Sequence, residues 1–132
     1  MTIDLPDDVG PWVPAADAAA AQLRESWAGP VGIDGVWGVL APGSVVVTVL
    51  TAQVGSHGGV AQFEGSVPGE DDTLWSGDRE HASGSRLVDG LRELVLVVEA
   101  ADGDLVVLAV SGPRDAFASG SLEKAFRTAR VA

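Results

Sequence analysis

The two most apolar segments of this chain lie close together in its C-terminal half. They cover residues 91–100 and 105–110, and Asp102-Gly103 separates them. Aspartate followed by glycine favours the positive φ angles of a tight turn between two antiparallel strands. The sequence therefore predicts a β-hairpin here, with Gly103 in the left-handed region that glycine adopts without a steric penalty.

The apolar residues of the expected strands follow one another without alternating polar positions. Residues 94–98 read LVLVV and residues 45–50 read VVVTVL. Neighbouring side chains of a strand point to opposite faces of the sheet, so such strands need cover on both faces. Two helices cover about one face of a five-stranded sheet. The second face is expected to be covered by residues 1–13 and 31–43, or by another molecule.

One helix is expected near each end of the chain. Residues 14–27 begin with Pro14, which suits a first helical turn, and carry an apolar stripe that ends at Trp27. Residues 119–132 carry a second stripe that includes Phe126, and Ser119 or Ser121 can cap this helix.

Three further segments complete the expected sheet. Residues 44–54 are rich in β-branched residues and predict a strand, which the four-residue loop GSHG joins to a second strand at 59–67. Residues 73–83 are a weaker strand candidate. Residues 31–43 remain ambiguous, because a short helical stripe there is interrupted by glycines.

This order of elements predicts a single α+β domain over residues 1–132. We expect an antiparallel sheet of about five strands, formed by successive hairpins, with an N-terminal and a C-terminal helix packed on it. Residues 1–13, which contain prolines, glycine and acidic residues, are expected to form an irregular arm.

The charge balance excludes several classes of partner. The chain has 19 acidic and 8 basic residues and a net charge of −11, so its field repels nucleic-acid backbones. The sequence contains no run of eighteen apolar residues, so we expect no membrane span. Its acidic start does not resemble a secretory signal. We therefore expect a cytoplasmic protein that binds neither nucleic acid nor membrane. One lysine against seven arginines, with abundant Ala, Val and Gly, is typical of a high-GC genome such as an actinobacterium's.

Two histidines are the candidates for chemistry. His57 lies in GSHGG, which is similar to the glycine-rich oxyanion loop of esterases, but no serine stands in a G-x-S-x-G motif. His81 follows Asp78 by three residues, a spacing that places the two side chains on opposite faces of a strand, with no third metal ligand. We expect His57 to be a solvated turn residue and His81 a loop or edge-strand residue, and we expect no catalytic group, metal or cofactor.

Four tryptophans are many for a chain of 132 residues. Trp27 fits the N-terminal helix, whereas Trp12, Trp37 and Trp75 lie in weakly patterned segments. Tryptophan is a common interface anchor, although each of these side chains could also cap the core. The candidate residues for an interface or a Trp-lined pocket are Trp12, Trp37, Trp75, Leu96 and Val98.

Three stretches of the sequence resemble the PsbP-like family. They are an early DLP…GPW element, the strand pair ELVLVVEAADGDLVVLAVSGP, and the closing DAFASGSLEKAFRTARV. The family includes photosystem accessory proteins, Ran-binding import factors and small actinobacterial proteins. The resemblance, which is strongest over residues 90–132, implies an antiparallel sheet with helices against it and a non-enzymatic binding or assembly role.

Two hypotheses of function follow from the sequence. The first is a non-enzymatic module that binds a protein partner or forms a homodimer through the apolar strands 45–50 and 94–98. The second is a small-ligand carrier or minor enzyme that uses a Trp-lined pocket with His57 or His81. Saturable quenching of tryptophan fluorescence by a metabolite would favour the second hypothesis.

Overall fold

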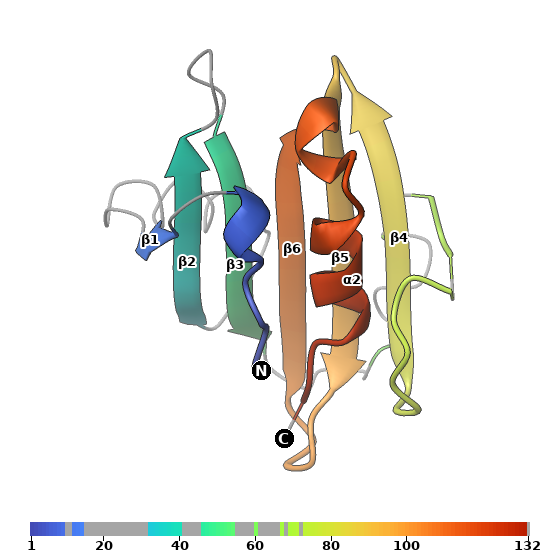
Figure 1. The fold of residues 1–132 in the computed structure, drawn as a ribbon. Helices are drawn as coiled ribbons and strands as arrows, with labels where there is room; N and C mark the ends of the chain where they lie inside the picture. Colours follow the sequence, from blue (N-terminus) through green and yellow to red (C-terminus); the bar gives the residue numbers. More distant parts are fainter. Residues whose placement is uncertain are drawn as a thin grey trace.

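The computed structural model shows an antiparallel sheet with the helix α2 packed on it (Figure 1). It describes residues 1–9, 12–14, 32–40, 46–54, 60, 67, 69–71 and 73–131. Within these residues the sheet has five long strands and one short one: β1 (Val13–Pro14), β2 (Gly32–Leu40), β3 (Val46–Val54), β4 (His81–Val88), β5 (Leu91–Glu99) and β6 (Leu105–Pro113). The described helical segments are η1 (Asp7–Val9), η3 (Arg114–Phe117) and α2 (Ser121–Arg127). The α+β class is confirmed.

The order of the strands in the sheet is β1-β2-β3-β6-β5-β4. Two antiparallel groups, β1–β3 and β4–β6, join through β3 and β6, which pair from Thr48 opposite Ser111 to Val54 opposite Leu105. The expectation of hairpins throughout is therefore wrong at the centre. A strand at 59–67 has no place beside β3, because β2 and β6 occupy both of its edges. Of the expected strand 59–67, Val60 lies in a helical turn and Val67 at a bend, whereas residues 59 and 61–66 and the expected loop at 55–58 lie outside the described residues.

The hairpin between β5 and β6 is confirmed, including its turn. The backbone N–H of Gly103 donates to the carbonyl of Ala100 at 3.0 Å, and that of Ala100 donates to the carbonyl of Asp104 at 2.8 Å. Gly103 has a φ of +87°. This is the pattern of a short hairpin loop whose last residue is left-handed.

We predict that Gly103→Val lowers the free energy of unfolding by about 1 kcal/mol or more. A Cβ at this position meets no atom within 4 Å, so the loss comes from the backbone conformation alone. Urea unfolding measures it, and Gly103→Asn, which tolerates positive φ, is the control with a smaller loss. Equal stability of the valine variant and the parent would contradict this account of the turn.

Both faces of β5 are buried, as its continuous apolar sequence predicts. The side chains of Leu94 to Val98 are each at most 2% exposed. Leu94, Leu96 and Val98 belong to the cluster that includes α2, whereas Val95 and Val97 belong to a second cluster. Both faces of β5 are therefore covered, by a different cluster on each side of the sheet.

The face that carries α2 is also covered by the N-terminal arm. Leu122, Phe126 and Phe117 are buried there, and the arm residues Met1, Ile3, Leu5 and Trp12 pack against the same cluster. Thr2 and Arg130 exchange backbone hydrogen bonds of 2.8 Å in both directions, which fixes the arm beside the end of α2. The arm thus lies on the helix face, and the expectation that it covers the second face is wrong.

The second face is covered in part by Val60 and Val67, which lie between β3 and β4 in the chain. They pack with residues from four strands: Ala52, Ala82, Val95, Val97, Leu105 and Val107. Residues 32–40 form β2 inside the sheet, so they are not the cover that the sequence suggested. The chain itself therefore covers this face at Val95 and Val97 of β5, one of the two strands that were expected to need a partner.

The two expected helices have different outcomes. The C-terminal helix is confirmed as α2, although its N-cap is Gly120, with a φ of +80°, in place of Ser119 or Ser121. For the N-terminal helix, Pro14 belongs to β1, and residues 15–27 lie outside the described residues.

The strand expected at 73–83 begins only at His81. In the described part of the chain, no helix has both the length and the apolarity to cross a membrane.

Candidate functional site

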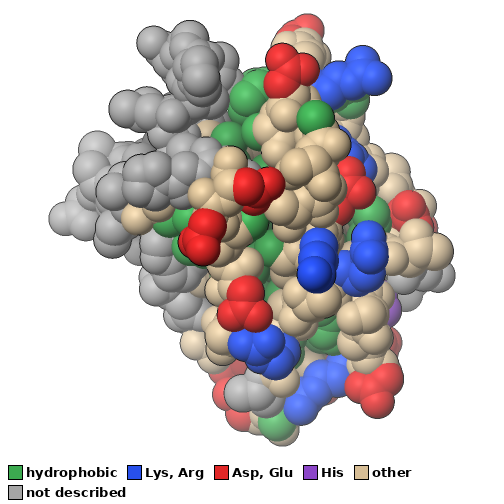
Figure 2. Space-filling view, viewed as in Figure 1, with side chains coloured by type: hydrophobic (Ala, Val, Ile, Leu, Met, Phe, Trp, Pro, Cys, Tyr) green, Lys and Arg blue, Asp and Glu red, His purple; other side chains and the backbone are tan. Residues whose placement is uncertain are grey.

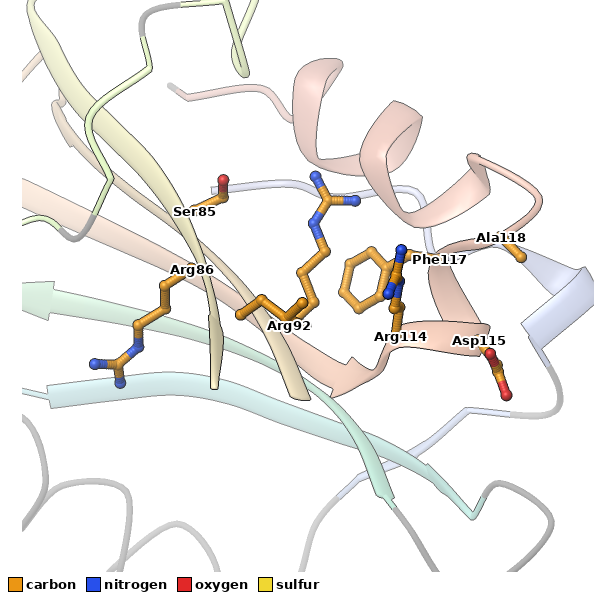
Figure 3. Close-up of a pocket in the computed structure, with 8 residues that line it drawn as sticks. Ser85, Arg86, Arg92, Arg114, Asp115, Phe117 and Ala118 are labelled. Atoms are coloured by element: carbon orange, nitrogen blue, oxygen red, sulfur yellow. The ribbon is translucent and has the colours of Figure 1, made fainter. Parts of the chain in front are cut away.

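A groove of about 530 Å³ opens at the end of the sheet where β4 turns into β5 and where β6 runs into η3 (Figure 3). Its lining comes from these elements: Ser85, Arg86, Leu87, Arg92, Arg114, Asp115, Phe117 and Ala118. The hairpin turn at Asp89-Gly90 and the start of η3 are held together, because the backbone N–H of Arg114 donates to the carbonyl of Gly90 at 3.0 Å. Regular elements therefore fix the positions of the groove residues.

Arg92 lies on the floor of the groove in a fixed position. Its guanidinium carbon is 5.2 Å from the ring centroid of Phe117, a cation–π distance. The same guanidinium forms an ion pair and hydrogen bond with the carboxylate of Glu123 on α2. Since Phe117 is buried, the stacked guanidinium has a rigid support, and its planar donors stay aligned for an oxyanion.

Arg114 is exposed at the rim of the groove, at the first residue of η3. Within the described residues, no carboxylate forms an ion pair with its guanidinium. Asp115 on the same rim is the acidic member of the lining. Arg86 instead pairs with Glu93 at 3.2 Å, and its side chain points away from those of Arg92 and Arg114 (Figure 3). Arg114 is therefore the unneutralised positive charge of the groove.

Charges of both signs lie on the side of the protein that carries α2. Figure 2 shows Lys and Arg side chains over α2 and towards η3, with Asp and Glu side chains among them, and Lys124 and Arg127 on α2 are exposed. In the groove lining, two of the three arginines are paired with glutamates, which leaves Arg114 as the arginine that can attract an anionic group.

The five residues selected from the sequence do not line this groove. Leu96 and Val98 are fully buried beneath α2, and Trp75 is 5% exposed. The indole N–H of Trp75 donates to the carbonyl of Ala129 at 2.9 Å, so this side chain fastens the end of α2 to the core. Three of the five residues thus serve the core of the domain.

The remaining two tryptophans lie towards the other edge of the sheet. Trp12 is half-buried against the helix-face cluster, and its indole N–H donates to the carbonyl of Pro6 at 2.9 Å. Trp37 lies on β2 opposite Val49. Neither the arginine-lined groove nor the hollow of about 310 Å³ beside the β5–β6 turn has a tryptophan in its lining.

His81 begins β4 and packs against Trp75, with the two ring centroids 4.9 Å apart in an edge-to-face contact. Its Nδ1 is 2.9 Å from the carbonyl of Arg79, so Nδ1 carries the donated proton. Its Nε2 is buried, with no hydrogen-bond partner in the structure. Within the described residues, no three potential ligands gather in a way that could hold a metal ion. His57 lies outside the described residues.

Comparison of the chain with protein-family models, with curated proteins and with solved structures finds no match. The resemblance to the PsbP-like family therefore stays a prediction from the sequence pattern. The groove is the feature that sequence reasoning missed. Its arginines are spread over residues 86–114, and the signal that could have found them was the tight turn Asp89-Gly90, which places Arg86 and Arg92 on paired strands.

Proposed function

We propose that the chain is a non-enzymatic, cytoplasmic module that binds a protein partner through the arginine groove between β4, β5 and η3. The observation that carries the proposal is Arg114, an exposed guanidinium without a paired carboxylate in the described part of a protein of net charge −11. Beside it, Arg92 is stacked on Phe117 and Leu87 is exposed. Arginine and exposed apolar side chains on rigid elements are typical of protein interfaces.

The burial of the core strands supports the groove over the sheet faces as the contact surface. Residues 94–98 are covered by α2 on one side and contact a cluster containing Val60 and Val67 on the other. A homodimer through these faces would need their residues to be accessible. A Trp-lined carrier site is also less favoured, because Trp75 is buried and bonded to Ala129.

The test is site-specific photo-crosslinking in cells of the source organism. A photoreactive residue replaces Leu87 in the groove or, as the control, Ala101, which is exposed at the opposite end of β5. We expect one crosslinked protein species from position 87 and none from position 101. Adding Arg114→Glu should abolish the crosslink from position 87, because it replaces the free cation with an anion.

Two results would contradict the proposal. Equal crosslinking from both positions would show random collision, and a crosslink that survives Arg114→Glu would show that the groove cation is not used. A crosslinked species with twice the mass of the chain would identify the partner as a second copy.

A further inference from the structure

The edge of β4 at Leu87, to which no described residue adds a strand, is a second feature of the arginine groove. We infer that the groove binds an extended acidic peptide segment, which adds a strand to β4 at Leu87 and places its carboxylates beside Arg114 and Arg92. This inference rests on the proposed function, because it specifies the partner of the same site.

The hydrogen bonds of β4 show which of its residues direct their backbone N–H and C=O groups away from β5, towards the outer edge of the sheet. The N–H of Asp71 donates to the carbonyl of Ser83 at 2.9 Å, and the N–H of Ser85 donates to the carbonyl of Gly69 at 3.2 Å. Residues 69–71 thus cover the outer edge as far as Ser85. Backbone groups alternate along an antiparallel strand, and the β4–β5 register has no shift, so the next outward-facing residue is Leu87.

Leu87 lies where this cover ends. Leu87 is 53% exposed. The other exposed large hydrophobic residue of the described chain is Leu91, at 47%. Among the described residues, no backbone hydrogen bond joins the outer side of Leu87 to another segment. An exposed strand edge is a template for pairing with an added strand. One residue offers one N–H and one carbonyl, so backbone pairing here supplies orientation and only part of the affinity.

The arginines provide the charge that selects the segment. Glu123 already binds Arg92, which shows that a carboxylate fits beside the guanidinium stacked on Phe117. Arg114 on the facing rim has no such carboxylate among the described residues. In an extended peptide, side chains on one face repeat every second residue, about 6.4–6.8 Å apart. A segment with acidic residues at alternate positions can therefore present its carboxylates to the groove while its backbone pairs with Leu87.

An acidic peptide fits the groove better than a nucleic acid. The net charge of −11 repels a long phosphate backbone more strongly than a short peptide that carries a few carboxylates. A peptide also uses the open backbone edge and the apolar side chain of Leu87. The segment is recognised by its alternating charge and its extended conformation.

The test is an NMR titration of the full chain, labelled with ¹⁵N. The probe is a capped six-residue peptide in which glutamate alternates with threonine. We expect the amide signals of Leu87 and Arg114 to shift saturably. We expect Arg114→Glu to raise the dissociation constant about tenfold or more, because a repulsion replaces a charge-assisted pair.

Three controls make the result specific. Lys124→Glu makes the same change of charge on α2 outside the groove lining and should change affinity less than about twofold, because salt and solvent screen an exposed charge that the peptide does not contact. A glutamine version of the peptide should not bind. A version with N-methylated central amides, which cannot pair as a strand, should bind at least about fivefold more weakly.

The outcomes test peptide binding and strand addition separately. Equal weakening by Arg114→Glu and Lys124→Glu, or no saturable binding, would overturn the inference. Binding that needs Arg114 but ignores N-methylation and leaves the Leu87 amide unshifted would overturn strand addition. In each case the crosslink from position 87 reports separately whether the groove binds a partner at all.

Discussion

Replacing Phe126 with alanine is expected to lower the free energy of unfolding by about 3–5 kcal/mol. Phe126 is fully buried between α2 and the sheet, in the cluster that includes Leu96 and Leu108. The helix has only seven residues, Ser121–Arg127, and a helix of this length is not stable alone in water. Its position therefore depends on the apolar side chains that it places on β5 and β6. Removal of the largest of them leaves a cavity and weakens the cover of one face.

Urea unfolding followed by circular dichroism measures this effect, and the melting temperature should fall by roughly 10 °C or more. Lys124→Ala is the matched control, because Lys124 lies on the exposed side of the same helix and should change stability by less than about 0.5 kcal/mol. A loss below about 1 kcal/mol for Phe126→Ala would show that α2 does not hold the helix face of the sheet.

Local signals in the sequence predicted the local parts of the fold. The turn at Asp102-Gly103 and the stripe of the C-terminal helix each depend on residues close in the chain, and both are confirmed. The same signal occurs at Asp89-Gly90, where the φ angles are +52° and +79° and where Val88 pairs with Leu91. These angles and this two-residue loop are typical of a type I′ hairpin turn. Sequence reasoning missed this turn because the preceding strand carries glycine, serine and arginine and lacks a clear apolar pattern.

The strand order could not be predicted, because it depends on a pairing between distant segments. The continuous apolar runs at 45–50 and 94–98 predict strands buried on both faces, and this expectation is confirmed for β5. Burial alone does not select the neighbouring strand, because β3 could pair with any other strand that is apolar on both faces. The observed pairing of Thr48 with Ser111 joins residues 63 positions apart (111 − 48). The cost in loop entropy of such a contact rises slowly with length, so chain distance gives a weak preference.

Sequence reasoning selected other residues for the candidate site because it relied on residue type. Tryptophans were selected because they often anchor interfaces, but Trp75 is used here to bind the end of α2 to the core. The groove depends on the turn of the β4–β5 hairpin lying beside the start of η3, where Arg114 donates its N–H to Gly90. The β5–β6 hairpin, in which Leu91 pairs with Pro113, brings those two places together. The unpaired charge of Arg114 is a property of that arrangement and is invisible in the order of residues.

A pair of leucine substitutions tests the assignment of core and groove at the same time. Leu96→Ala is expected to cost about 2–5 kcal/mol of unfolding free energy, because Leu96 is fully buried between β4 and β6 at the centre of the helix-face cluster. The same substitution at Leu87, whose side chain is 53% exposed, removes the same atoms from a mostly solvated position. It should cost less than about 1 kcal/mol.

In binding, we expect the larger effect from Leu87→Ala and little effect from Leu96→Ala. Leu87→Ala keeps the backbone groups that pair with an added strand, so the peptide titration should show modestly weaker binding with the amide shift at position 87 retained. Leu96→Ala, measured in urea-free buffer at a temperature where it stays folded, should bind as the parent does, because Leu96 does not line the groove. Similar losses of stability for both variants would contradict the burial of β5. A folded Leu96→Ala variant that fails to bind would show that the groove depends on the core beneath it.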